Sequence, residues 1–330
     1  MKRNTVFVDL YQKKYETSEL LQLVASHIQQ NLIKVGKKYY RQKQGIPQGS
    51  ILSSTLCNYF YADLEAHVLS FLNSDDSLLS RLIDDFLLIT ADRSKAVRFM
   101  QILHQGVPEY GVTVNPKKSL VNFDLEIDGQ KISKLEDGKQ FPYCGTLIDT
   151  KTLDITRASN QDQDKSKLPV YDSLTVEFSR TPGQTFQRKV LNAFKIQSHI
   201  MFFDTGLNSA PTMLSNIRRA FVETATKMWA YTRCLPALKQ PSPDVVIKTI
   251  QRLVDTAYLL LVSKTRKLRY PDYVCDVKKC EVSWLAYNAF HQVLSRKQSN
   301  YTKTLAWLKA ESVKLNLLKD IRHGRVQTVV

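Results

Sequence analysis

The apolar positions in the first half of the chain alternate between helical spacing and short continuous runs. Helical spacing over residues 20–32, 52–71 and 97–103 predicts amphipathic helices in these segments. Short apolar runs at residues 5–11 and 141–148 are typical of strands. Because strands and helices alternate, we expect this half to pack its helices around one sheet in an α/β layer arrangement.

The second half of the chain changes pattern after a polar stretch at residues 158–167, which we expect to be a linker or an exposed loop. From Gln184 onward glycine is rare and the pattern is helical, with further helices expected at residues 213–231, 245–262, 282–294 and 301–318. The sequence therefore predicts two domains, residues 1–150 and residues 151–330.

A pair of carboxylates interrupts the apolar segment at residues 80–90. Asp84 and Asp85 stand between two short apolar runs, and we expect a tight hairpin with these two residues at its turn, because Asp tolerates a positive φ. Neighbouring carboxylates repel each other, and a divalent cation relieves that repulsion. The pair is therefore a candidate metal site, and a solvated turn is the alternative interpretation.

A glycine-rich loop precedes the helix expected at residues 52–71. Two glycines bracket a proline, and Ser50 stands where it would cap the helix. Free backbone N–H groups at a helix N-terminus suit a phosphate or a sugar–base edge, although an ordinary loop-to-helix transition has the same composition. The candidate binding residues of this loop are Gln44, Gly45, Ile46, Pro47, Gln48 and Gly49.

The composition favours a polyanionic partner. The 330 residues are 43% hydrophobic and carry a formal net charge of +16, which favours nucleic acid first and an acidic membrane surface second. Scattered cysteines without a disulfide framework indicate a reducing compartment. Because no apolar run is long enough to span a bilayer and no signal peptide is visible, we expect a soluble, intracellular chain.

Three further sets of residues are candidate binding sites with alternative interpretations. The basic run at residues 34–43, with Tyr39 and Tyr40 inside it, is either a solvated strand pair or a nucleic-acid contact. In the helical half, Arg188, Lys189 and Lys195 form either a solvated helix face or a face that lies along a phosphate backbone. A zinc site is disfavoured because its candidates are widely spaced and lack a second pair: Cys275, Cys280 and His291.

Several motifs together resemble the telomerase reverse transcriptase family. They are residues 45–53, residues 84–90, residues 106–111 with Val114, Asn115 and Lys118, and residues 141–149. The resemblance is close over residues 1–150 and looser beyond, through Arg188-Lys189 and residues 207–209. It implies an α+β fold, in which a reverse-transcriptase palm, an antiparallel sheet with packed helices, is followed by an all-helical thumb. Residues 1–150 would be a partial fingers and palm domain, and residues 151–330 the thumb, or C-terminal extension.

The resemblance also implies roles for individual residues. Asp84 and Asp85 match the catalytic carboxylates that hold Mg²⁺, and Lys118 matches a lysine beside the departing pyrophosphate. The loop at residues 44–49 matches the nucleotide and template site, while Tyr143, Cys144 and Gly145 match the primer grip. The implied partners are template RNA, a telomeric DNA primer, dNTPs and telomerase accessory proteins, in the nucleus at telomeres.

The third metal-binding carboxylate of the family has one candidate, Asp9. It ends a predicted strand, but Lys14 stands where the family carries an aromatic residue, so we expect Asp9 to be structural. The chain would then be a C-terminal portion that is inactive alone. Two alternatives stay open: a retroelement or intron-encoded reverse transcriptase that uses Asp9 as its third ligand, and a non-catalytic nucleic-acid-binding module.

Overall fold

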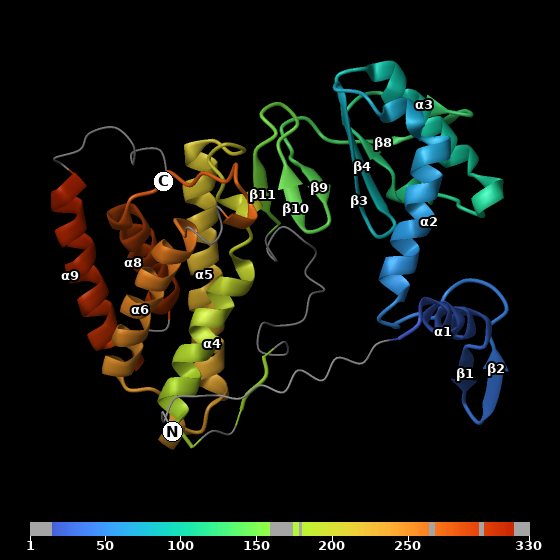
Figure 1. Cartoon of the computed structure of the whole chain (residues 1–330). Helices are drawn as coiled ribbons and strands as arrows, with labels where there is room; N and C mark the ends of the chain where they lie inside the picture. Colours follow the sequence, from blue (N-terminus) through green and yellow to red (C-terminus); the bar gives the residue numbers. More distant parts are fainter. Residues whose placement is uncertain (1–14, 159–173, 178–179, 264–267, 297–299, 320–330) are drawn as a thin grey trace. The chain divides into compact units, whose positions relative to one another are not determined.

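The computed structural model describes residues 15–158, 174–177, 180–263, 268–296 and 300–319 (Figure 1). It contains two compact units. The N-terminal unit comprises Met1–Ser119 and Leu125–Ile132, and the C-terminal unit comprises Leu120–Asp124 and Ser133–Val330. Asp9 and the strand expected at residues 5–11 lie outside the described residues.

The N-terminal unit contains the three helices that the apolar spacing predicts. A small apolar core lies between α2, α3 and the β3–β4 hairpin, and its buried members are Leu64, Leu69, Leu72, Phe99, Leu103 and Val107. The elements of this unit are α1 (Thr17–Gln29), β1 (Leu32–Val35), β2 (Lys38–Arg41), α2 (Ser53–Val68), η1 (Ser70–Leu72), β3 (Ser77–Leu82), β4 (Asp85–Thr90), α3 (Arg93–Gln105), η2 (Pro108–Tyr110), η3 (Pro116–Lys118), β6 (Glu126–Ile127) and β7 (Gln130–Lys131).

Local interactions explain where α3 begins and which face of it is buried. The Asp92 carboxylate accepts a hydrogen bond from Ser94 N at 2.7 Å, which satisfies one of the free N–H groups at the start of the helix. Phe99 and Leu103, one helical turn apart, are the buried side chains of this helix. The helix therefore covers the hairpin with a single apolar face.

The strands of the first half do not form one sheet. In the described residues β1 pairs only with β2, β3 only with β4, and β6 only with β7. The expectation of a single sheet was wrong for this part of the chain, because short turns join each strand to its neighbour in the sequence.

The C-terminal unit combines two small sheets with a helical bundle. Its three-stranded antiparallel sheet has the order β11–β10–β9, and β5 pairs with β8 in parallel. Its elements are β5 (Leu120–Val121), β8 (Ser133–Lys134), β9 (Phe141–Tyr143), β10 (Thr146–Ile148), β11 (Ile155–Arg157), α4 (Pro182–Gln197), η5 (Ile200–Phe202), α5 (Ala210–Cys234), η6 (Ala237–Lys239), α6 (Pro243–Leu261), α8 (Lys279–Ser295) and α9 (Thr302–Lys319).

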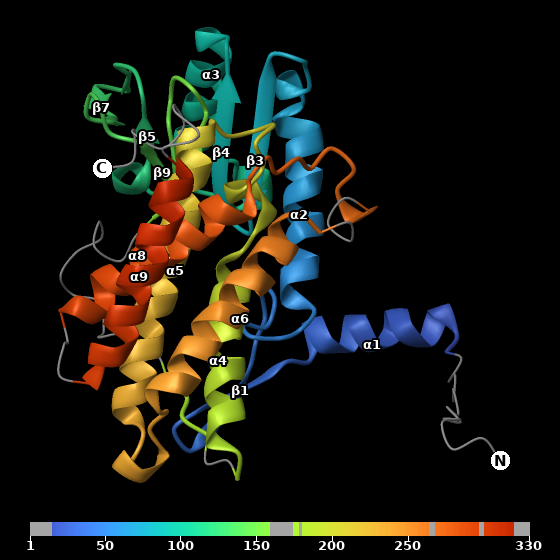
Figure 2. The same cartoon turned by 90° about the vertical axis from the view of Figure 1, so that its left-hand side faces the viewer.

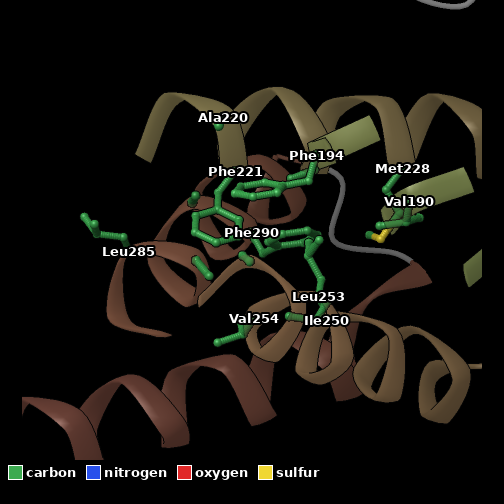
Figure 3. Close-up of a cluster of buried hydrophobic side chains, with 14 of the residues drawn as sticks. Val190, Phe194, Ala220, Phe221, Met228, Ile250, Leu253, Val254, Leu285 and Phe290 are labelled. Atoms are coloured by element: carbon green, nitrogen blue, oxygen red, sulfur yellow. The ribbon is translucent and has the colours of Figure 1, made fainter. Parts of the chain in front are cut away.

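The helical bundle has the larger core of the two units. Helix α5 packs against α4 and α8 (Figures 1 and 2), and the Phe194 and Phe221 rings stack with centroids 4.8 Å apart. Phe290 and Leu253 close the cluster from α8 and α6 (Figure 3). The helices expected from residue 184 onward are confirmed, as is the α+β fold class.

Two buried asparagines of the C-terminal unit complete strand β11. Asn208 Oδ1 accepts a hydrogen bond from Ile155 N at 2.7 Å, and Asn216 Nδ2 donates to Ile155 O at 2.8 Å. Both asparagines are buried, so their side chains satisfy backbone groups that would otherwise lack partners. The sheet that contains the β9–β10 turn is thereby fixed to α5.

The described residues contain neither a candidate metal cluster nor a helix suited to crossing a membrane. No group of three or more His, Cys, Asp or Glu side chains that could hold a metal ion occurs in the described residues. Cys275, Cys280 and His291 therefore do not form such a group. None of the helices in these ranges combines the length and the apolar character that crossing a membrane requires.

Candidate active site

The candidate carboxylates lie at the turn of the β3–β4 hairpin, as the sequence predicts. The strand register pairs Leu82 with Asp85, so the two turn residues are Ile83 and Asp84. The predicted turn at Asp84 and Asp85 was therefore wrong by one residue. Ile83 takes the positive φ, 59°, which is a rare conformation for a β-branched side chain. Asp84 and Asp85 are both exposed at this end of the hairpin.

Arg81 explains why the turn is held in this position. Its guanidinium donates to Ile83 O at 2.8 Å and to Asn58 Oδ1 at 3.1 Å, and its Nε pairs with the Glu65 carboxylate. The Arg81 side chain is only 10% exposed. Because Asn58 and Glu65 belong to α2, this one side chain binds the carboxylate turn to the helix beside it.

Aromatic rings complete the setting of Arg81. The guanidinium lies 5.0 Å from the Tyr61 ring centroid, and Tyr61 meets the Phe86 ring edge-on at 5.6 Å. Burial raises the pKa of the Tyr61 hydroxyl, the electrostatic influence of the neighbouring Cys57 and Asp84 side chains raises it further, and the Arg81 cation acts in the opposite direction. Sequence reasoning missed Arg81, although a lone cation in an apolar run was a visible signal.

Asp84 and Asp85 fit part of a divalent metal site. Carboxylate oxygens are the ligands that Mg²⁺ takes from proteins, and adjacent exposed carboxylates can approach one ion without further burial. No group of three candidate ligands occurs in the described residues, so the pair by itself offers two carboxylates to a metal ion. A bound divalent ion would offset charge on the reacting phosphate and would lower the pKa of the attacking hydroxyl.

The loop at residues 44–49 is shaped by local hydrogen bonds. Gly45 and Gly49 take positive φ values of 77° and 79°, a conformation that favours glycine. The Gln42 side chain donates to Gln44 O at 2.9 Å and to Ile46 O at 3.2 Å, which fixes the first half of the loop. Pro47 is buried, whereas Gln44, Gly45, Gln48 and Gly49 are exposed.

The expected cap of α2 by Ser50 was wrong. The helix begins at Ser53, its N-cap residue is Leu52, and no side chain caps it. Ser50 Oγ instead lies 2.8 Å from His27 Nε2 and accepts from Leu52 N at 3.2 Å. The Ser50 hydroxyl therefore connects α1 to the loop, and no side chain caps the N-terminus of α2.

Lys118 is exposed at the end of a short 3₁₀ turn in the same unit as Asp84. Asn115 Oδ1 accepts from Lys117 N at 3.0 Å and begins this turn. On the other side of Lys118, Ser119 Oγ lies 3.0 Å from His104 Nε2 on α3. The backbone around the lysine is therefore held at both ends.

The expected turn at Cys144 and Gly145 is confirmed. The register pairs Tyr143 with Thr146, and the two residues between them have positive φ values of 45° and 79°. Positive φ at both turn positions is the pattern of a type I′ hairpin. This turn lies in the C-terminal unit, whereas the carboxylates and the loop at residues 44–49 lie in the N-terminal unit.

The three basic residues expected to contact a phosphate backbone lie on α4. Arg188 and Lys189 both form ion pairs with the Glu177 carboxylate, with a Lys189 Nζ–Glu177 Oε1 distance of 2.8 Å. Lys195 is exposed and forms no ion pair with another described residue. Part of the positive charge of this face is therefore already compensated within the protein.

Comparisons with known proteins first define the class. Residues 9–147 match the family model described as "Reverse transcriptase (RNA-dependent DNA polymerase)". This match includes the carboxylate hairpin, the loop at residues 44–49 and Lys118, so the N-terminal part has the sequence pattern of a reverse transcriptase.

The second half narrows the class to one family. Residues 184–309 match the model "Telomerase reverse transcriptase, C-terminal extension". The chain is 33% identical over 304 residues to the telomerase reverse transcriptase of Bos taurus, covering 90% of this chain and 26% of that protein. The chain is also 33% identical over 320 residues to the telomerase reverse transcriptase of Oryzias latipes, covering 94% of this chain and 29% of that protein. The chain belongs to the telomerase reverse transcriptase family.

A solved structure has the same fold. The telomerase of Candida albicans, in complex with a TWJ fragment of telomeric RNA, superposes with a TM-score of 0.57 at 18% identity. The match covers 92% of this chain and 43% of that chain. The chain spans less than a third of the length of the curated relatives named above, 26% and 29%.

Proposed function

We propose that this chain is part of the catalytic subunit of a telomerase, an RNA-directed DNA polymerase that extends a telomeric DNA primer on an RNA template. The observation that carries the proposal is the exposed acid pair at the β3–β4 turn, held by Arg81 and lying inside the reverse-transcriptase match. The telomerase C-terminal extension in the same chain supports the telomeric substrate.

The roles proposed for the residues follow from their chemistry. Asp84 and Asp85 would hold Mg²⁺, which would supply acidification of the primer 3′-hydroxyl and offset the negative charge of the incoming dNTP phosphates. Lys118 faces the departing pyrophosphate as a charge partner. The exposed groups of residues 44–49 contact the nucleotide and the template. Polymerisation of this kind depends mainly on positioning and charge neutralisation, so a rigid turn suits the acid pair.

The C-terminal unit has proposed contacts of its own. Tyr143, Cys144 and Gly145 hold the primer 3′ end, and the type I′ turn gives this hairpin a defined tip. Arg188, Lys189 and Lys195 contact the DNA backbone, where a phosphate would compete with Glu177 for the first two. We propose a division near residue 150 into a palm part and a thumb, which the matches at 9–147 and 184–309 support.

The setting of the enzyme follows from the same proposal. The polymerase works with its template RNA and with telomerase accessory proteins, in the nucleus at telomeres. The chain spans only part of its relatives' length, and our proposal requires substrate contacts and metal ligands beyond those of the described residues. The chain alone is then expected to be inactive.

Removing one carboxylate charge tests the proposal. Asp84→Asn and Asp85→Asn, introduced at the protein's own gene, should each lower primer extension by the purified ribonucleoprotein on the order of 10³-fold, because a metal ligand is worth several kcal/mol in the transition state. The control is Asp75→Asn, the same charge change in the exposed segment before β3. Extension that survives both site variants would overturn the proposal.

A further inference from the structure

The β1–β2 hairpin has two faces of different chemistry. Cross-strand partners lie on one face, and alternate residues of a strand share a face. The pairs Leu32 with Arg41 and Lys34 with Tyr39 therefore form one face, which we call the Tyr39 face. The opposite face, called the Tyr40 face, consists of Ile33, Val35, Lys38 and Tyr40. The register thus places two cations around Tyr39 and only one beside Tyr40.

All eight side chains of the hairpin are exposed to solvent. The Tyr39 side chain is 68% exposed, and the Lys34 ammonium lies 5.6 Å from its ring centroid. Among the described residues no carboxylate lies within ion-pair distance of Lys34, Lys38 or Arg41. An exposed aromatic ring between uncompensated cations is a surface that nucleic acids recognise.

We propose that the Tyr39 face binds a single nucleic-acid strand. Tyr39 stacks on one base, while Lys34 and Arg41 contact the phosphates on either side of it. Stacking needs a base that is free of its duplex neighbours, which favours a single strand over a duplex. A lipid surface would favour apolar side chains beside the cations, and these are concentrated on the other face.

The hairpin is connected to the loop at residues 44–49 by one side chain. Gln42 Oε1 accepts from Asn31 Nδ2 at 2.8 Å at the base of the hairpin, and Gln42 Nε2 donates to Gln44 O and Ile46 O. A strand held on the Tyr39 face is therefore delivered next to that loop. Resting on the polymerase function proposed above, the strand is the unpaired template as it approaches the nucleotide site.

The register supplies a matched pair of variants for the test. Lys34→Ala and Lys38→Ala remove the same charge from opposite faces of the same hairpin. Binding of the full chain to short single-stranded RNA and DNA oligonucleotides and to a duplex is measured by fluorescence anisotropy at several salt concentrations. For single strands, the slope of the logarithm of the binding constant against the logarithm of the salt concentration should become shallower by about 0.7 in Lys34→Ala. The same slope should stay unchanged in Lys38→Ala.

Stacking is tested at Tyr39 itself. Tyr39→Ala should weaken single-strand binding at least about five-fold, while Tyr39→Phe keeps it, because stacking needs the ring and not the hydroxyl. A photoreactive 4-thiouridine oligonucleotide should cross-link to the peptide that contains Tyr39. Equal losses for Lys34→Ala and Lys38→Ala, or a cross-link absent from this hairpin, would refute the proposal.

The outcome is independent of catalysis. The polymerase proposal is tested by primer extension in Asp84→Asn, whereas this proposal is tested by single-strand binding in Lys34→Ala and Lys38→Ala, so failure of one is distinguishable from failure of the other. Preference for RNA over DNA identifies the strand as template, and the reverse preference contradicts that assignment.

Discussion

In the C-terminal unit, large side chains such as Phe194, Phe221 and Phe290 are fully buried among the helices. In the N-terminal unit, no residue of α1 is buried, and α2 buries only Leu64. The proposed catalytic groups nevertheless lie in the N-terminal unit, which has the smaller buried core. Binding and chemistry need accessible side chains, whereas stability comes from apolar area removed from water, so the two tasks favour different units.

The two units also hold their hairpins differently. Strand β11, at the edge of the sheet that contains the β9–β10 turn, is fixed by two uncharged amides, Asn216 of α5 and Asn208 just before that helix. The β3–β4 turn is fixed by the charged side chain of Arg81, paired with Glu65. Hydrogen bonds to charged groups are stronger than neutral ones. A turn with little core beneath it is therefore stabilised by one well-connected guanidinium.

The largest expected effect lies in the helical core. Phe221→Ala removes a fully buried ring that stacks on Phe194 and should destabilise the C-terminal unit by about 3–5 kcal/mol. Tyr59→Ala, at a side chain 73% exposed on α2, should cost no more than about 0.5 kcal/mol. Both are measured by denaturant unfolding of the full chain. Similar costs for the two variants would break the contrast between the units.

A smaller effect on stability, with a larger one on activity, is expected at Arg81. Arg81→Met leaves the Glu65 carboxylate without its cation and Ile83 O without its donor, at a cost of about 1–3 kcal/mol. Primer extension should fall about ten-fold through kcat rather than the dNTP KM, because the acid pair is misplaced by a fraction of an ångström. Arg81→Lys, which keeps the charge, should recover only part of this. An unchanged kcat would show that the turn holds its position without Arg81.

The smallest effect is an electrostatic one at the other end of the same hairpin. The Lys95 ammonium, hydrogen-bonded to Asp76, lowers the pKa of that carboxyl from 3.8 to about 2. Since the folded-state pKa is the lower one, the stabilising contribution is present above pH 3.8 and is lost as the pH falls toward 2. In Lys95→Met, carboxyl NMR titration should show the Asp76 pKa raised part of the way toward 3.8, because the Ser74 and Ser77 hydroxyls still donate to this carboxylate, and acid unfolding should shift slightly upward in pH. An unaltered Asp76 pKa in Lys95→Met would rule out the Lys95–Asp76 ion pair as a cause of the lowered pKa.

Local patterns predicted the elements well. Apolar spacing identified the helices in both halves, and the Cys144-Gly145 pair identified its own turn, because these signals lie within a few residues of each other. The predictions that were wrong depend on partners that local patterns do not specify, namely how the strands pair and where the Ser50 hydroxyl bonds. Ser50 could cap α2 or bond to His27, and only the placement of α1 decides for His27.

The sequence by itself determined that two adjacent acids follow a short apolar strand, that a glycine-bracketed loop precedes a helix, and that the chain is strongly basic. The tertiary structure decided which residues make the turn, which side chain holds it, and which face of the basic hairpin carries two of the three cations on its strands. The physical reason is distance along the chain. Arg81 reaches Glu65 16 residues away and Asn216 reaches Ile155 61 residues away, and no periodicity records such pairs.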